Sequence, residues 1–275
     1  MANETPVHFF DINSNLPIPS KSWSPNTLRT RLVLNFKKIP YTQSFISYPD
    51  IAPLLKSASV PPLHGARVPY TLPAIAHPSS IGTSHGVLND SWPIALHLEK
   101  TFQSPQHPTL FPSAGSYALA LAVARVLNAI LPPTRMILLP KIPQILDERG
   151  AEYFRRTRAE WFGRSLEEML SDTEGVEKSW ADVEVELKLL ADMLRGPPGV
   201  NGGGKKKGPF FEGEQAGYAD LLFAAFLAWY ERGDRKDWER AVSIGDGEIR
   251  RFWDACLPWI HGQGEEKEYV FDKEG

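Results

Sequence analysis

The sequence predicts a two-domain α+β protein, in which a half of about 100 residues that mixes strands and helices precedes an all-helical half. Three observations predict this class. Short apolar runs of strand length alternate with helical spacing up to about residue 102, a segment rich in Pro, Ser, His and Gly follows at 105–116, and helical spacing dominates beyond it. With 275 residues and 42% hydrophobic content, the chain can form two cores of unequal size.

The first three elements are predicted to form a β-α-β unit. Residues 6–12 are an apolar run of strand length, and apolar residues recur at helical spacing over 26–37. The stretch 41–48 then alternates in polarity like a half-buried strand. Because a helix connects the two strands, we expect them to be parallel and the crossover to be right-handed.

The next elements continue the first domain. A short helix is predicted at 50–56, and the loop at 57–70 is rich in Pro, Gly and His. Residues 70–76 predict a strand that contains Pro73, with 86–89 as its partner. A proline in this position belongs to a strand start, an edge or a bulge, and it can also mark a cis peptide bond.

A predicted helix over 92–102 closes the first domain. The preceding pair Asp90-Ser91 consists of residue types that cap helices. The order of elements is therefore β-α-β followed by β-β-α. We place the first domain at 1–104, a linker at 105–116 and the helical domain at 117–275.

Helical spacing predicts the elements of the second domain. Its first helix should stop before the Pro132-Pro133 pair, since proline disrupts a helix interior. Gly217 is a plausible N-cap for the fourth helix, with Asp220 as the acid of its first turn. Residues 196–209 predict an exposed loop, and 261–275 a charged tail that packs only in part. The predicted helices are 117–131, 150–170, 176–194, 219–230 and 248–260.

Composition argues against several classes of function. A net charge of -3 and a pI near 6.2 give no general attraction to nucleic acid or to acidic membranes. The longest apolar run, 119–131, is too short to span a bilayer, and the N-terminus lacks the pattern of a secretion signal. The single cysteine, Cys256, is expected to be a buried packing residue. Because a single cysteine fits a reducing compartment, we expect a cytoplasmic protein. We expect no metal site, because the seven histidines show no metal-ligand spacing.

The stretch Trp23–Arg31 carries the candidate chemistry. Ser24 and Asn26 are residue types that cap a helix, and Pro25 suits the first helical turn, so capping is the simpler interpretation. The alternative is catalytic. A helix N-terminus stabilises an anion such as a thiolate, and a Ser hydroxyl that donates a hydrogen bond to the sulfur lowers the thiol pKa.

Four local motifs, in this order, resemble those of the cytosolic glutathione transferases. Ser24–Arg29 resembles the serine-type motif at the first helix, and Thr71–Pro73 resembles the segment whose proline is cis. Asn89–Ser91 resembles the acidic-Ser pair, and Gly217–Leu221 resembles the capping motif of the central helix. The resemblance covers nearly the whole chain. It implies a thioredoxin-like N-terminal domain (β-α-β-β-β-α) followed by an all-α helical bundle.

The resemblance also implies roles for individual residues toward glutathione. Ser24 would donate a hydrogen bond to the glutathione sulfur, with Asn26 as the second candidate because its amide can also donate. Leu72, before the cis Pro73, would pair through its backbone with the cysteinyl moiety. The further candidates are Asp90 and Ser91 for the γ-glutamyl end and, unranked, Lys56, His64 and Arg67 for the glycyl carboxylate.

A second substrate, hydrophobic or aromatic, would lie between the loop at 13–22 and the first helices of the second domain. The aromatic residues of this region can equally be core residues. The family resemblance further implies a homodimer. The candidates for the second-substrate pocket are Trp23, Tyr117, Tyr153, Phe154 and Trp161.

Within the family, the Ser-Pro-Asn-Thr motif at 24–27 and Tyr48–Ile51 are similar to fungal etherase-type enzymes, including the class (FuA-like) that binds wood-derived polyphenols. The resemblance thus implies a transferase that acts on aromatic electrophiles, in detoxification or aryl-ether chemistry. A ligandin-type protein that binds aromatic metabolites without turnover is the alternative, and a scaffold that retains only the fold is a third. Fold-level analogy does not separate these functions.

Overall fold

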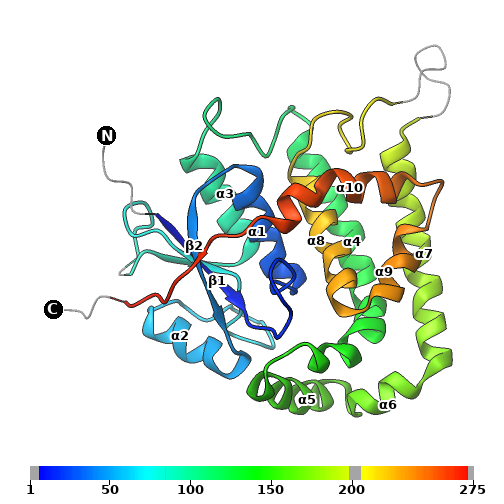
Figure 1. Cartoon of the computed structure of the whole chain (residues 1–275), viewed down its shortest axis with the longest axis horizontal. Coiled ribbons are helices and arrows are strands. Elements are labelled where there is room, and N and C mark those ends of the chain that lie inside the picture. The colour runs from blue at the N-terminus through cyan, green and yellow to red at the C-terminus, as the bar shows by residue number, and fades with distance from the viewer. Residues whose placement is uncertain (1–5, 84, 198–205, 272–275) are drawn as a thin grey trace.

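The computed structural model describes residues 6–83, 85–197 and 206–271, and Figure 1 shows a sheet-containing half beside a helical half. This architecture confirms the fold class that the sequence predicts: a thioredoxin-like domain with a mixed sheet, followed by an all-α domain.

The sheet contains β1 (Val7–Ile12), β2 (Tyr41–Ile46), β3 (Ala74–Ala76), β4 (Val87–Asn89) and β5 (Glu265–Glu266). Their spatial order is β4-β3-β1-β2-β5. The β1–β2 pair is parallel, as predicted for a helical crossover, and β3 is antiparallel to both β1 and β4. All six residues of β1 are buried, so this strand lies in the core.

The third strand is shorter than predicted. It begins at Ala74, so residues 70–73 of the expected strand precede it as irregular chain. The Leu72–Pro73 peptide bond is cis, as the family resemblance implies. Because Pro73 has no N–H to donate to a ladder, regular pairing starts only after it, and its carbonyl accepts a hydrogen bond from Asp90 N instead.

Three helices belong to the first half. They are α1 (Pro25–Phe36), α2 (Ile51–Ser57), which follows a short 3-10 turn at Tyr48–Asp50, and α3 (Ser91–Thr101). Helix α1 packs between the sheet and α8 (Tyr218–Gly233) of the helical half (Figure 1), and most of its residues are buried. Its N-terminus therefore lies near the junction of the two halves.

The first helix of the second half is longer than predicted. Helix α4 (Ser116–Leu138) continues through Pro132-Pro133, where we expected it to stop. The two prolines leave the carbonyls of Asn128 and Ala129 without helical partners. Both of these residues are exposed, so water can bind their carbonyls and the helix tolerates the prolines.

The extension of α4 also changes the prediction about membrane spans. With the 3-10 turn Leu139–Gln144, the stretch Ser116–Gln144 is long and apolar enough to cross a bilayer by length and composition. One side of α4 packs against α7 (Thr173–Arg195) and α8. A core helix of a folded domain has the same length and composition, so this stretch is weak evidence for a membrane span.

The helix expected over 150–170 is interrupted. Helix α5 (Glu148–Phe162) ends at Gly163, which has a φ of 67°, and α6 (Leu166–Ser171) starts after it. A left-handed residue at this position terminates a helix, and glycine adopts it without strain. Apolar spacing alone does not detect the break, because the spacing continues across it.

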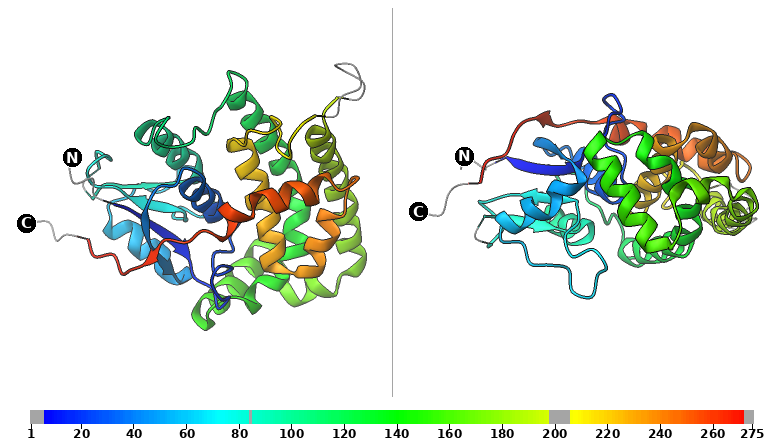
Figure 2. Two further views of the ribbon diagram at one scale, coloured as in Figure 1. Left: turned by 45° about the horizontal axis from the view of Figure 1, so that its top comes forward. Right: turned by 90° about the horizontal axis from the view of Figure 1, so that it is seen from below.

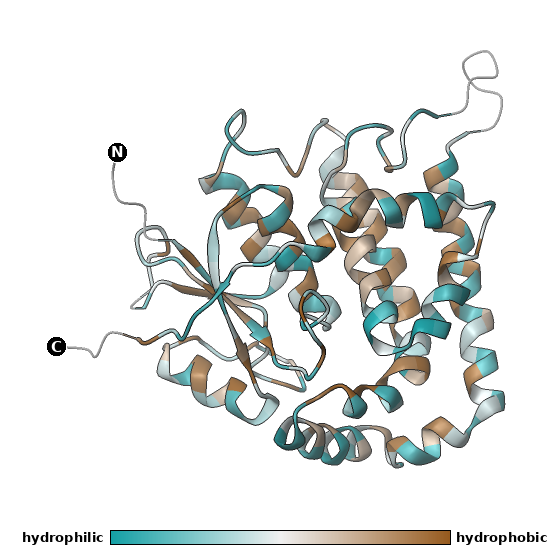
Figure 3. Cartoon of the chain, in the orientation of Figure 1, coloured by the Kyte–Doolittle hydropathy of each residue, from teal (hydrophilic) through white to brown (hydrophobic). Residues whose placement is uncertain are grey.

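The remaining helices surround α8 (Tyr218–Gly233), which is buried along most of its length and is apolar in Figure 3. The cap prediction is confirmed: Gly217 is the N-cap, and Asp220 Oδ2 accepts a hydrogen bond of 2.8 Å from its backbone N–H. The neighbours of α8 in sequence are α7 (Thr173–Arg195), α9 (Arg235–Val242) and α10 (Glu248–His261). Cys256 is buried, as predicted.

Two elements were missed in the sequence. Helix α9 is strongly charged, and its start is set by Asp234, whose carboxylate accepts from Lys236 N and Asp237 N. The tail after α10 is also more ordered than predicted. It returns to the sheet (Figure 2), where β5 pairs with β2, and Tyr269 packs against Phe10. A strand of two glutamates has no sequence signal, because its pairing depends on a partner far away in the chain.

The loop predicted at 196–209 lies partly outside the described residues, since the structure describes none of 198–205. At its end, Lys206 is half-buried and donates to the carbonyls of Met193 and Phe210. This residue therefore anchors the end of the loop rather than lying free in solvent.

Candidate functional site

A cavity of about 470 Å³ lies between the two halves of the molecule. One wall comes from the start of α1, the 3-10 turn after β2, and the loop at 67–72. The other wall comes from α4, α5 and α8. Such a cavity between domains, largely apolar with a few polar groups, is the usual form of a small-molecule site.

Ser24 lies at the N-terminus of α1 and lines the cavity. It occupies the N-cap position, but its side chain makes no capping hydrogen bond, and its hydroxyl has no partner among the described residues. The simpler interpretation, capping by Ser24, therefore lacks its defining bond. Asn26 also lines the cavity and is exposed. Both predicted candidates thus lie where a ligand can reach them.

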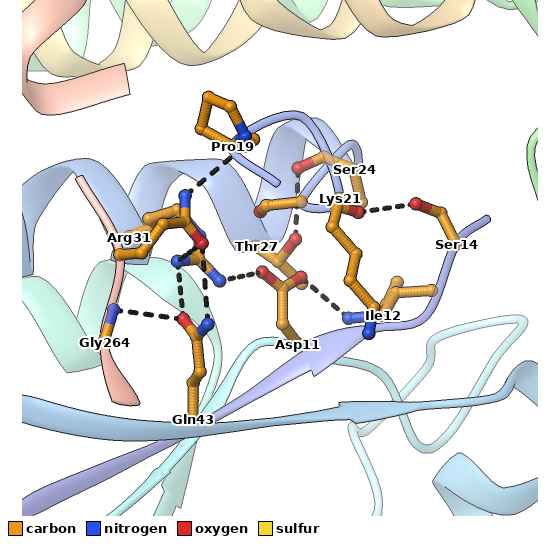
Figure 4. A network of polar contacts seen from close by, with 12 residues as sticks. Asp11, Ile12, Ser14, Pro19, Lys21, Ser24, Thr27, Arg31, Gln43 and Gly264 are labelled. Atoms are coloured by element: carbon orange, nitrogen blue, oxygen red, sulfur yellow. Dashed lines mark hydrogen bonds and ion pairs between the residues drawn. The ribbon is translucent and has the colours of Figure 1, made fainter. Parts of the chain in front are cut away.

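Backbone contacts position Ser24. Its carbonyl accepts the first helical hydrogen bond, 2.9 Å from Leu28 N, and a second of 3.3 Å from Thr27 Oγ1. The loop before it is held by Ser14 Oγ, which donates to Lys21 O at 2.7 Å (Figure 4). These bonds use the carbonyl of Ser24 and leave its hydroxyl available.

A buried polar network fixes α1 to the sheet (Figure 4). Arg31 on α1 forms a fully buried ion pair with Asp11 on β1, with 2.8 Å between Nη2 and Oδ2. Its Nη1 donates to Gln43 on β2 at 2.7 Å, to Gln263 at 2.9 Å and to Tyr41 at 3.2 Å. The network therefore joins α1, two strands and the C-terminal tail, and it orients the helix whose first turn carries Ser24.

Leu72 and the cis Pro73 lie beside the cavity. Leu72 lines it, and the Leu72 backbone N–H and carbonyl have no hydrogen-bond partner in the described part of the chain. A free donor and acceptor on one residue can pair with a peptide in the manner of a strand. This is the arrangement that the family resemblance implies for the cysteinyl moiety.

Asp90 and Ser91 lie at the N-terminus of α3, outside the lining of the cavity. Asp90 is exposed with a φ of 75°, and neither side chain caps the helix. Arg29 connects them to the cavity, because it lines the wall and interacts electrostatically with Asp90 and with Tyr218. Burial lowers the pKa of Arg29, and these two residues oppose the decrease.

The three candidates for the glycyl carboxylate occupy different places. Arg67 lines the cavity, whereas His64 is exposed on the same loop and does not. Lys56 does not line the cavity but lies close to it: it is exposed, and its Nζ lies 5.4 Å from the ring centroid of Tyr70, which is a lining residue. Position thus favours Arg67 among the three.

The aromatic candidates divide in the same way. Trp23, Tyr153, Phe154 and Trp161 line the cavity. Tyr117 does not: it packs against Trp92 and Phe111 on the outer side of α4, with 44% of its surface exposed. The part of α4 that lines the cavity contains Leu127, Leu131 and Arg135, whereas Tyr117 lies in its first turn. The prediction that Tyr117 lines the pocket is therefore wrong.

Sequence reasoning missed several lining residues, of which Arg135 and Arg158 are charged. One signal could have found Arg158: Phe154, Arg158 and Trp161 recur at positions i, i+4 and i+7, which lie on one helix face. A charge within an aromatic stripe indicates a functional face rather than core. The other missed residues include Tyr48, Tyr70, Leu127, Leu131, Phe226 and Trp229.

Burial perturbs the titrating groups of this wall. Burial raises the pKa of Tyr48 to about 12, so its phenol stays protonated and can donate a hydrogen bond at neutral pH. Burial also lowers the pKa of Arg158, against the opposing influence of Tyr48 and Tyr153. Arginine nevertheless remains charged at neutral pH because its ordinary pKa is so high.

Comparisons with known proteins agree with this geometry. The sequence pattern of glutathione S-transferase N-terminal domains matches residues 23–101, and that of glutathione S-transferase C-terminal domains matches residues 118–259. The glutathione S-transferase-like protein ustS of Aspergillus flavus is 51% identical over 270 residues, which is 97% of this chain and 95% of the relative.

Solved fungal structures are also similar. The glutathione S-transferase CsGST63524 of Ceriporiopsis subvermispora, in complex with glutathione, is 32% identical with a TM-score of 0.78, covering 93% of this chain and 98% of that one. Glutathione transferase GSTFuA3 of Phanerochaete chrysosporium is 29% identical with a TM-score of 0.72, covering 98% and 99%.

Proposed function

Because this chain belongs to the glutathione S-transferase family, we propose that it is a glutathione transferase in which Ser24 activates the thiol for attack on aromatic electrophiles. The observation that carries the proposal is the unpaired Ser24 hydroxyl at the N-terminus of α1, beside a cavity with an aromatic wall. The partial positive charge of the helix N-terminus and the hydroxyl would together stabilise the thiolate.

The reaction is a nucleophilic displacement. The glutathione thiol loses its proton to solvent, and the thiolate attacks the electrophilic carbon. With an aryl chloride, the new C–S bond forms, the C–Cl bond breaks and chloride leaves with the bonding electron pair. Ser24 keeps its proton throughout and acts by donating a hydrogen bond to sulfur, with Asn26 as the second candidate for this role.

We place glutathione along the first wall of the cavity. The free backbone groups of Leu72 would pair with the cysteinyl moiety, next to the cis Pro73. The γ-glutamyl end would extend toward Asp90 and Ser91. For the glycyl carboxylate we favour Arg67, with Lys56 and His64 as the less well placed candidates.

Calorimetry and turnover together test the proposal. Glutathione binding should be measured for the wild type and for Ser24→Ala, with turnover of chlorodinitrobenzene in parallel. Binding by both proteins, with turnover reduced about 10- to 100-fold in the variant, is the expected result. Failure of the wild type to bind glutathione would overturn it and leave a protein that retains only the fold.

A ligandin-type binder is the second candidate, and the aromatic character of the second wall favours it. Such a protein would bind aromatic ligands tightly, show little turnover and be indifferent to Ser24→Ala. The same pair of measurements distinguishes the two candidates. In a ligandin-type binder, the wild type and Ser24→Ala would both bind ligand, and neither would show appreciable turnover.

The subclass, the assembly and the location are further parts of the proposal. The Ser-Pro-Asn-Thr motif and the likeness to GSTFuA3 support an etherase-like or FuA-like enzyme, with detoxification or aryl-ether cleavage as its role. We propose a cytoplasmic homodimer. The dimer would bury an apolar patch on α3 and α4 that consists of Trp92, Leu96, Tyr117 and Leu121.

A further inference from the structure

The cavity carries a local excess of positive charge. Four arginines line it, namely Arg29, Arg67, Arg135 and Arg158, and its described lining contains no Asp or Glu. The chain as a whole has a net charge of -3, so this excess is a property of the cavity and not of the composition. Four cations in a lining that contains no carboxylate indicate an anionic occupant.

Glutathione accounts for only part of this charge. Its two carboxylates would meet the first wall, where Arg29 lies near Asp90 and Arg67 lies on the loop before Leu72. Arg135 and Arg158 come from α4 and α5 of the helical half, which Arg67 also contacts by donating from Nη1 to the Trp161 carbonyl at 3.5 Å. Two cations therefore remain for the second substrate.

Arg158 is held in place but not neutralised. Its guanidinium lies 4.0 Å from the ring centroid of Trp161 and 4.1 Å from that of Phe154. Its Nη1 donates to Thr157 Oγ1 at 2.9 Å, and its Nε–H has no acceptor. Among the described residues it forms no ion pair. The aromatic rings thus orient the guanidinium while its charge and its Nη2 donors stay available.

Arg135 adds a second uncompensated charge. It forms no ion pair or side-chain hydrogen bond with any described residue, and partial burial lowers its pKa. It is close enough to Arg158 for the like-charge repulsion to lower the pKa of Arg158 as well. Two neighbouring cations without a counter-ion repel each other, and a bound anion would relieve that repulsion.

We infer that the second substrate is an aromatic compound with an anionic oxygen substituent, such as a carboxylate or sulfonate, which Arg158 and Arg135 bind together. Its ring would pack along Tyr48, Phe154 and Trp161. In so far as it concerns a co-substrate, this inference rests on the proposed transferase function. The anion site itself depends only on the two arginines and the aromatic wall.

A matched pair of fluorescent ligands tests the inference. Anilinonaphthalene sulfonate and its uncharged parent, phenylnaphthylamine, differ only in the sulfonate. Both should be titrated into the glutathione-saturated protein and into the protein alone. The variants are Arg158→Met, which removes the charge, Arg158→Lys, which keeps it, and Arg135→Met. Arg155→Met is the control, because Arg155 lies on the same helix but does not line the cavity.

The wild type should bind the sulfonate more tightly than the neutral ligand by at least about 10-fold. Arg158→Met should weaken sulfonate binding by about 10- to 100-fold, the range of a lost charge-assisted hydrogen bond, and change neutral-ligand binding by less than about 3-fold. Arg135→Met should act in the same direction, Arg158→Lys should recover part of the loss, and Arg155→Met should bind like the wild type.

Three results would overturn the inference. They are equal binding of the two ligands by the wild type, equal losses for both ligands in Arg158→Met, and an equal loss of glutathione affinity in that variant. The last would assign Arg158 to a glutathione carboxylate. The wild type could also prefer the sulfonate over the neutral ligand but neither bind nor turn over glutathione. That result would refute the proposed transferase function and still support the anion site.

Discussion

Arg31 and Asp11 form an ion pair in which both side chains are fully buried, with 2.8 Å between Nη2 and Oδ2. The pair joins α1 to β1 seven residues after Ser24, so it determines where the first turn of α1 lies relative to the sheet. Breaking a pair of this kind leaves one charge buried without compensation.

We therefore predict that Asp11→Asn lowers the free energy of unfolding by about 3–5 kcal/mol. The exposed pair of Arg149 and Asp50 offers a matched control, since Asp50→Asn should leave the free energy of unfolding nearly unchanged. Urea denaturation of the three proteins measures both effects. Equal losses for the two variants would show that the buried pair has no special structural importance.

Ser24→Ala should retain glutathione binding and reduce kcat/KM by about 10- to 100-fold, the size of one hydrogen bond to a charged group. The apparent pKa of the bound thiol should rise by about 1–2 units, so the rate would reach its plateau at higher pH than in the wild type. A pH–rate profile and thiolate absorbance measure this. If Asn26→Ala shows the larger shift instead, Asn26 is the donor.

The buried carboxyl of Asp220 should make the free energy of unfolding depend on pH. Burial raises the pKa of its carboxyl to about 6, outweighing the hydrogen bonds from Gly217 N and Phe211 N that favour the charged form. The folded state therefore binds the proton more tightly than the unfolded state. The contribution of Asp220 to stability is largest below about pH 4 and is lost as the pH rises to about 6.

In Asp220→Asn this pH-dependent contribution should vanish, and stability should fall by about 1–3 kcal/mol because one of the two N–H groups loses its acceptor. The quantity to measure is the difference between wild-type and variant unfolding free energies from pH 4 to pH 7. A difference that stays constant across this range would contradict the raised pKa.

Leu121→Asp should convert the proposed dimer to a monomer, because it places a charge in the apolar patch on α3 and α4. Leu121 is 48% exposed in the single chain, beside Tyr117 at 44%. Val185→Asp is the control, since Val185 is 64% exposed on α7 and is not one of the patch residues. Light scattering gives the masses, and a monomeric wild type would refute the proposed assembly.

Local patterns in the sequence predicted most of the elements. The period of the apolar residues identified α7 and α8, and the Gly217 and Asp220 cap was visible because both residues act within one helical turn. The motif around Ser24 likewise indicated a helix start, and the structure places Ser24 in the lining of a cavity. These features are determined by neighbours in the chain, so the sequence by itself was sufficient.

Tertiary structure decided the rest, because it depends on contacts between distant segments. Helix α4 continues through Pro132-Pro133 since the lost carbonyl partners face solvent, and β5 exists only because β2 offers it an edge. In the same way, only the tertiary structure brings Arg135 and Arg158 to one cavity, and it leaves Tyr117 on the outer surface. A helix start can be recognised from residues that are adjacent in the sequence. The charge of a cavity depends on side chains from several segments, and only the folded structure shows which of them line it.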